Sequence, residues 1–216
     1  FSRQNPMDSG VVLENGVICV KQDGKSRPVL PVEDILLPGV HNIENYMAAF
    51  AAVRGMVSYE TMREIAKTFG GVEHRIELIR TRKGVRWYND SIATSPTRTI
   101  AGLNSFNQKI IIIAGGYDKK IPFEPLAPKI LEKVKVLILT GLTAPKIEAA
   151  VTGCQGYDPQ QLTILHAKDL EEAVHLAREN AVPGDIVSLS PACASFDCYP
   201  NFEARGNHFK QIVNGL

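Results

Sequence analysis

The sequence predicts an α/β protein with a Rossmann-like, doubly wound and mostly parallel sheet. Apolar segments of strand length recur after residue 75, at 76–82, 85–89, 109–114, 134–139, 162–165 and 185–189. Segments whose apolar residues have helical spacing follow the second and later strands, near 96–105, 123–132, 143–151, 169–180 and 200–213. Strands that alternate with helices are typical of a parallel sheet with helices on both faces.

The first 71 residues follow a different pattern. Two apolar runs flank Asn15-Gly16, which is a strong signal for a β-hairpin. A short extended piece then ends in a turn at Pro38-Gly39, and helical spacing predicts a helix over 42–54. Because this block has no complete sheet of its own, we expect it to be the end of a larger domain.

A second helix is expected after Ser58, whose hydroxyl can cap the first turn. Gly70-Gly71 is expected to stop this helix. The apolar residues at helical spacing, which we expect to be buried, are Met62, Ile65, Ala66 and Phe69.

Composition narrows the classes of function. The chain has 216 residues, 44% of them hydrophobic, and a net charge of +1, which gives no electrostatic footprint for nucleic acid or an anionic membrane. Its longest apolar stretches are far shorter than the roughly 20 residues that span a bilayer. The four cysteines are scattered, so we interpret them as reduced thiols rather than zinc ligands. The chain opens on Phe1-Ser2-Arg3, from which we expect a piece of a longer protein.

Polar turns follow three of the predicted strands. They occupy residues 89–94, 115–120 and 190–197 and carry hydroxyls, a carboxylate and lysines. Ligands of open parallel sheets bind beyond the carboxyl ends of the strands. The three turns therefore predict one convergent binding site.

Each of these residues also has a structural interpretation. Asp90, Ser91 and Thr94 can cap the following helix or present its free N–H groups to an anion. Gly115-Gly116 matches neither dinucleotide nor phosphate-loop patterns, although glycines there let a ligand approach the backbone. Lys119 and Lys120 either bind an anion or are solvated.

Two further residues have competing interpretations. Arg75, beside His74, can swing its guanidinium onto a phosphate or lie on the surface. Cys193 has no histidine nearby in the sequence to activate it, so we interpret it as a small buried thiol.

Three motifs taken together are more specific than any one of them. They are Leu37-Pro38-Gly39-Val40-His41-Asn42-Ile43-Glu44-Asn45, Glu73-His74-Arg75 and Asn89-Asp90-Ser91-Ile92-Ala93-Thr94. With the runs 190–197 and 201–206, they make the chain resemble the Mur ligase family of peptidoglycan synthesis, from about residue 10 to the end.

The resemblance implies a domain organisation. The family has a UDP-sugar domain, a central ATPase domain and a Rossmann-like third domain. Residues 1–73 would be the C-terminal part of the central ATP-binding domain, and 74–216 the Rossmann-like domain that binds D-glutamate. The family's phosphate loop, carbamylated lysine and main magnesium ligands belong to parts outside this chain, so we expect the chain alone to be inactive and assign no metal ligand within it.

The resemblance also implies an activity. It is that of an ADP-forming ligase that joins D-glutamate to UDP-N-acetylmuramoyl-L-alanine through an acyl phosphate. Its cofactors would be ATP and Mg²⁺, and its place the cytoplasm, in cell-wall biogenesis. We expect a monomer with neither a nucleic-acid nor a membrane partner.

Site residues carry over from the family motifs by position. Asn45, with Asn42 nearby, would contact the adenine region, Arg75 the ATP phosphates and Asp90 the nucleoside. The D-glutamate site would be lined by Thr94, Lys119, Ser195 and Phe196, with Phe202 packed beside it. Arg75 and Lys119 are the candidates for a catalytic role.

Two departures from the family pattern affect this assignment. Ile92 stands where the family often has lysine, and the turn Gly-Gly-Tyr-Asp-Lys-Lys replaces the usual Gly-Gly-Asp-Gly-Lys. Counting from the glycines favours Lys119, but Lys120 remains open. The alternative from another class is a stand-alone Rossmann-like module that binds a nucleotide.

Overall fold

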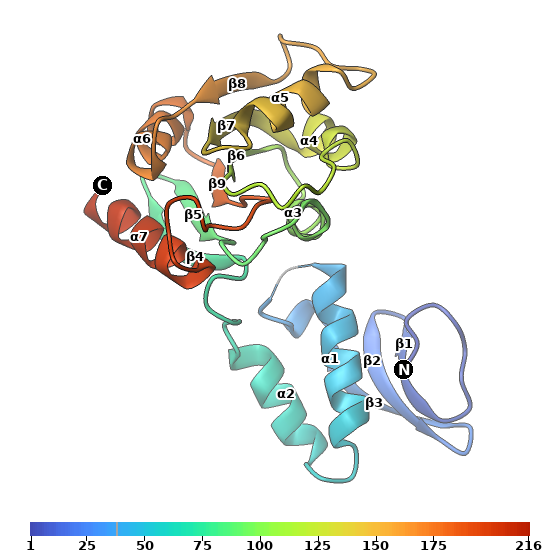
Figure 1. Cartoon of the computed structure of the whole chain (residues 1–216). Helices are drawn as coiled ribbons and strands as arrows, with labels where there is room; N and C mark the ends of the chain where they lie inside the picture. Colours follow the sequence, from blue (N-terminus) through green and yellow to red (C-terminus); the bar gives the residue numbers. More distant parts are fainter. Residues whose placement is uncertain (38) are drawn as a thin grey trace. The chain divides into compact units, whose positions relative to one another are not determined.

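The computed structural model describes residues 1–37 and 39–216, so Pro38 of the predicted extended piece lies outside the described residues. The chain divides into two compact units, residues 1–70 and 71–216, which are described separately (Figure 1). The sequence predicted a boundary at 73/74, three residues further along.

The first unit combines a small antiparallel sheet with helices. The strands lie in the order β1-β2-β3. The elements are β1 (Gly10–Glu14), β2 (Val17–Gln22), β3 (Lys25–Pro31), the 3-10 helix η1 (Val32–Asp34), α1 (Val40–Val53) and α2 (Tyr59–Thr68). Its core is built from buried side chains of the sheet and the two α-helices, among them Val11, Ile18, Leu30, Met47, Phe50, Met62 and Ala66.

The predicted hairpin at Asn15-Gly16 is confirmed. Both residues have left-handed backbone, with φ of 48° and 78°, which matches the right-handed twist of the two strands. The sequence did not predict β3, which follows a second turn of the same kind at Asp23-Gly24. The polar start of β3 concealed it, because only Val29 and Leu30 of this strand are buried.

Helix α2 begins as predicted, since the Ser58 hydroxyl accepts a hydrogen bond from the Thr61 N–H. Met62 is buried as expected, but Ile65 is 52% exposed and Phe69 is 43% exposed, so their predicted burial is wrong. The helix ends at Thr68, which takes Phe69 off the buried face. Ile65 lies about 60° around the helix from Met62, outside the narrow stripe that packs on the sheet.

The second unit is built on a six-stranded sheet, and the predicted Rossmann-like, doubly wound fold is confirmed. The strand order is β4-β5-β9-β6-β7-β8. β4 pairs antiparallel with β5, and all other neighbours are parallel. The strands are β4 (Glu77–Arg82), β5 (Val85–Asn89), β6 (Ile110–Gly115), β7 (Val134–Thr140), β8 (Thr163–His166) and β9 (Ile186–Leu189).

Helices cover both faces of this sheet (Figure 1). Alternate residues of β6 serve the two faces: Ile110 and Ile112 pack with α3, α4 and α5, while Ile111 and Ile113 pack with α6 and α7. A strand buried on both faces reads as a continuous apolar run, which is why it was visible in the sequence. The helices are α3 (Pro96–Leu103), α4 (Ala127–Lys133), α5 (Ala144–Thr152), α6 (Leu170–Asn180) and α7 (Phe202–Gly215).

Within the described residues, none of the helices combines the length and apolar character needed to cross a membrane.

Candidate functional site

Three loops leave the sheet together where β5, β9 and β6 end. These strands are adjacent, and Leu189 pairs with both Asn89 and Ile113, so the loops start at nearly the same level. We call the loops 90–95, 116–120 and 190–197 the carboxyl edge. The sequence predicted that polar residues of these loops converge, and the topology brings them to one edge.

Arg205 of α7 ties two loops of the carboxyl edge, 90–95 and 190–197, to one another. It is 4% exposed. Its guanidinium donates to the Ser91 hydroxyl at 3.0 Å and to the backbone oxygens of Ser91, Cys193 and Ala194 at 2.9, 3.0 and 3.2 Å. Burial lowers the pKa of Arg205 to about 10, so the group stays charged at neutral pH. A fixed buried cation therefore holds the ends of β5 and β9 together.

Asp90 is buried at the same edge. Its carboxylate accepts hydrogen bonds from the Ile76 N–H at 3.3 Å and from the Ser190 hydroxyl at 3.1 Å. The Ser190 hydroxyl also lies 3.2 Å from the Thr99 hydroxyl of α3. Burial raises the pKa of Asp90 to about 7, against the opposing effect of these hydrogen bonds and of nearby arginines. Among the described residues, the Asp90 carboxylate is thus hydrogen-bonded to the backbone of Ile76 and the side chain of Ser190.

A second polar network lies beside Asp90. The buried Asn89 amide donates to Nδ1 of His74 at 2.8 Å, which leaves the proton of a neutral ring on Nε2. Glu77 accepts from the His74 N–H at 2.9 Å and pairs with Lys210 at 2.6 Å. Although burial opposes it, these contacts set the pKa of Glu77 below its ordinary value. The network joins the start of β4, the end of β5 and helix α7.

The two glycines at the end of β6 are required by packing within the protein. Gly115 and Gly116 have φ of 118° and 143°. A Cβ on Gly115 would collide with the backbone oxygen of Thr140, and one on Gly116 with that of Ala194. The sequence suggested that these glycines let a ligand approach the backbone. In the structure, the backbone oxygens of Thr140 and Ala194 make that close approach. The glycines place the 116–120 loop directly against the 190–197 loop.

Cys193 is the small buried thiol that the sequence predicted. Its sulfur lies 3.1 Å from the Thr143 hydroxyl, which also bonds the backbone of Gly116. Burial raises the pKa of Cys193 to about 11. The thiol is therefore protonated at neutral pH and is a poor nucleophile.

The outer surface of the carboxyl edge is open and mixed in character. Phe196 is 64% exposed and Tyr117 is 42% exposed, and their rings make an edge-to-face contact with centroids 6.0 Å apart. Lys119 and Lys120 are exposed on the same loop as Tyr117. Lys120 has left-handed backbone and donates its N–H to Asp118, whose carboxylate pairs with Lys146 of α5. Lys119 forms no ion pair within the described part of the chain.

The other residues predicted for the D-glutamate site lie around this surface. Thr94 is half-buried in the first loop, and Ser195 is buried in the third, where its carbonyl accepts from Cys198 and Tyr199. Phe202 begins α7, and its ring meets that of His74 edge-on at 6.0 Å.

The residues predicted to contact the nucleotide fall in two units. Arg75 is exposed in the second unit, just before β4. Asn42 and Asn45 lie in the first turns of α1 in the first unit, where the Asn45 amide donates to the Asn42 side chain at 3.3 Å. The structure thus brings five of the predicted residues to one edge of the second unit: Asp90, Thr94, Lys119, Ser195 and Phe196. The two asparagines belong to the first unit.

Sequence reasoning missed Arg205. It lies in the quoted run 201–206, but no role was assigned to it. The available signal was its neighbour Gly206, because a glycine inside a helix usually has a packing reason. A Cβ on Gly206 would collide with the ring of His74, so the glycine lets α7 approach the Asn89–His74 network.

Comparison with known proteins identifies a family. Residues 74–193, more than half of the chain, match the family model described as Mur ligase, glutamate ligase domain. The chain is 51% identical over its full length to the UDP-N-acetylmuramoylalanine--D-glutamate ligase of Acetivibrio thermocellus, covering 47% of that protein. It is 50% identical to the protein of the same name from Clostridium beijerinckii, covering 46% of it.

The chain therefore spans about half the length of the curated relatives it matches. Among solved structures, a pseudomurein peptide ligase type C from Methanothermus fervidus superposes with a TM-score of 0.66 at 18% identity, over 100% of this chain and 43% of that one. At this identity the likeness shows the shared fold.

Proposed function

Because the chain belongs to the Mur ligase family, we propose that it is a carboxy-terminal part of the ATP-dependent ligase that adds D-glutamate to UDP-N-acetylmuramoyl-L-alanine. The names of relatives that are about half identical over the whole chain support this substrate pair. They favour it over the alternative of a stand-alone nucleotide-binding module. The first unit then belongs to the ATP-binding domain, and the second holds D-glutamate.

One observation supports the D-glutamate site most. Lys119 has no ion pair in the described residues. Its loop is held in place by hydrogen bonds from the Gly116 N–H to the Thr143 hydroxyl and from the Tyr117 N–H to the Ala194 carbonyl. D-Glutamate carries two carboxylates, which need charged and hydroxyl donors. Lys119, Thr94 and Ser195 can supply them, while the exposed ring of Phe196 and that of Phe202 can pack on its methylene groups.

The proposed chemistry proceeds through an acyl phosphate. The carboxylate of L-alanine receives the γ-phosphoryl group of the substrate ATP, with release of ADP. The amine of D-glutamate attacks the acyl carbon, the bond to phosphate breaks, phosphate leaves with the electron pair, and the nitrogen loses a proton. Neither step needs a protein nucleophile, in keeping with the raised pKa of Cys193. The residues of this chain contribute position and charge.

The nucleotide contacts are part of the proposal. Arg75 is exposed and free to meet phosphates, and Asn42 and Asn45 are assigned to the adenine region. Asp90 is assigned to the nucleoside, and it also holds the carboxyl edge through Ile76 and Ser190. The described residues contain no cluster of His, Cys, Asp or Glu that could hold a metal ion.

The test uses the full-length protein. When the purified protein is incubated with ATP, Mg²⁺, UDP-N-acetylmuramoyl-L-alanine and D-glutamate, it should release one ADP and one phosphate for each amide formed. L-Glutamate should be a far poorer substrate than D-glutamate. The 216-residue chain should release neither product, and the full-length enzyme should elute as a monomer in size-exclusion chromatography. Amide formation with a different amino acid in preference to D-glutamate would refute the proposed substrate.

A further inference from the structure

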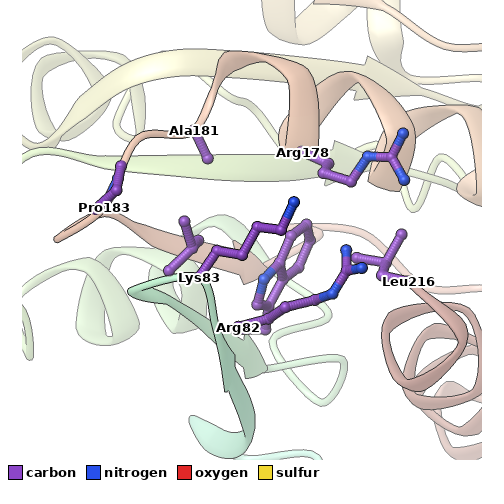
Figure 2. Close-up of a pocket in the computed structure, with 8 residues that line it drawn as sticks. Arg82, Lys83, Arg178, Ala181, Pro183 and Leu216 are labelled. Carbon is purple, nitrogen blue, oxygen red and sulfur yellow. The ribbon is translucent and has the colours of Figure 1, made fainter.

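A cavity of about 180 Å³ opens at the opposite edge of the six-stranded sheet (Figure 2). It lies where β4 turns into β5 and where α6 ends, and we call this side the amino edge because the parallel strands begin there. The four residue steps of β5 from Val85 to Asn89 separate the cavity from the carboxyl edge by about 13 Å. The proposed ligase chemistry makes no use of it.

The floor of the cavity is apolar and firmly held. Val85 and Trp87 line it and are buried in the sheet core. Gly84 and Pro183 belong to two turns that pack together: a Cβ on Gly84 would lie 3.0 Å from Cβ of Pro183. The Gly184 N–H donates to the Gly84 carbonyl at 2.9 Å. The cavity is therefore formed before any ligand arrives.

Three cationic side chains surround this apolar floor. Arg82 ends β4, Lys83 lies in the turn, and Arg178 comes from α6 (Figure 2). None of the three makes an ion pair with a residue in 1–37 or 39–216. The acid on the adjoining turn, Asp185, is already paired with Lys135 at 2.6 Å. Like charges around one cavity repel each other, and a bound anion would relieve that repulsion.

We propose that this cavity binds a single aromatic ring that carries an anionic group, such as an aryl phosphate or aryl carboxylate. A volume of about 150 Å³ is enough to hold benzene, whereas drug-sized ligands need roughly 300–1,000 Å³. The ring would lie on the floor formed by Val85 and Trp87, and the anion would face Lys83 and Arg178. This inference does not depend on the proposed ligase function.

Fluorescence of the 216-residue chain tests the proposal, because Trp87 is its only tryptophan. Titration with phenyl phosphate should give a saturable change with a Kd of about 1 mM, as expected for so small a ligand. Inorganic phosphate, which has the charge without the ring, and benzyl alcohol, which has the ring without the charge, should each bind at least roughly 10-fold more weakly.

Variants of the cations locate the site. Lys83→Gln and Arg178→Gln should each raise the Kd for phenyl phosphate by roughly 3- to 10-fold, and the double variant by more. Arg98→Gln is the matched control, because Arg98 is an exposed arginine of α3 that does not line the cavity. The proposal fails if no saturable change occurs well above the expected Kd, if inorganic phosphate binds equally well, or if the double variant keeps the original Kd.

Discussion

The two edges of the six-stranded sheet are built in different ways. The carboxyl edge buries the polar residues Asp90, Ser91 and Ser190, and hydrogen bonds connect them to one another and to the buried Asn89 and Arg205 beside them. The amino edge has an apolar floor and cations that reach solvent. Buried polar groups are costly unless every one is satisfied, so the carboxyl edge is rigid and specific. The amino edge instead presents a preformed apolar surface beside cationic side chains that reach solvent.

The two edges also differ in backbone strain, which is greater around the carboxyl edge. At the amino edge, the left-handed residues Lys83 and Gly84 form the tight turn that a hairpin requires. Around the carboxyl edge, His74, Ile76 and Ala192 also have positive φ, of 65°, 47° and 58°, although no hairpin demands it. Each such residue costs about 1–3 kcal/mol, and such strain is typical of functional sites.

Replacing the central cation should give the largest effect. Arg205→Met keeps much of the side-chain volume but removes the donors to Ser91, Cys193 and Ala194. The free energy of unfolding should fall by about 3–5 kcal/mol, because several buried acceptors lose their partners. Urea denaturation of the 216-residue chain measures it, with Arg178→Gln at the amino edge as control. A loss below about 1 kcal/mol would show that the edges do not differ as described.

The buried carboxyl group should make stability depend on pH. The pKa of Asp90 is raised from 3.8 to about 7, so the unfolded chain releases this proton at lower pH than the folded chain. The resulting stabilisation is complete below about pH 4 and is lost as pH rises through about 7. Between pH 5 and 8 the loss should be about 2–3 kcal/mol.

Asp90→Asn separates this contribution from other titrations. The free energy of unfolding of the variant, measured by urea denaturation at several pH values, should be flatter between pH 5 and 8 than that of the parent chain. If both chains show the same pH dependence, the Asp90 carboxyl group does not titrate as described.

Helix α7 contains one glycine in a tightly packed position, Gly206, and one in open space, Gly215. Gly206→Ala should lower the free energy of unfolding by about 1–2 kcal/mol, because the new methyl group would collide with His74 despite the better helix propensity of alanine. Gly215→Ala, with nothing within 4 Å, should be neutral or stabilising by a few tenths of a kcal/mol. Thermal or urea denaturation compares them. Equal effects would mean that the close approach at Gly206 is unimportant.

Substitutions of the cations at the amino edge should have the smallest effect on stability. Lys83→Gln and Arg178→Gln each remove a charge that has no ion-pair partner among the described residues. The free energy of unfolding should change by less than about 0.5 kcal/mol in urea denaturation. A loss of more than about 1 kcal/mol would mean that these cations stabilise the fold rather than await a ligand.

The sequence predicted most of the fold because its signals were local. The run Ile110–Ala114 is apolar throughout and reads as a strand, and Asn15-Gly16 reads as a turn. Strand β3 was missed because its first four residues are exposed. The burial of Ile65 was wrong because helical spacing does not reveal how wide the buried stripe is.

The candidate site was predicted in part. The position of polar turns after three strands follows from the general geometry of parallel sheets. The role of Arg205 could not be read locally, because its acceptors lie about ten residues away in the 190–197 loop and more than a hundred away at Ser91. The burial of Asp90 likewise depends on Ser190 and α3, which only the folded chain brings together.

We propose that the carboxyl edge binds D-glutamate through a lysine of the 116–120 loop. The most direct test compares Lys119→Ala with Lys120→Ala in the full-length enzyme. Lys119→Ala should raise the apparent KM for D-glutamate roughly 10- to 150-fold, as loss of a charge-assisted contact of about 1.5–3 kcal/mol would, and leave that for ATP nearly unchanged. A loss confined to Lys120→Ala would move the contact by one residue, and an unchanged KM for D-glutamate in both variants would contradict the claim.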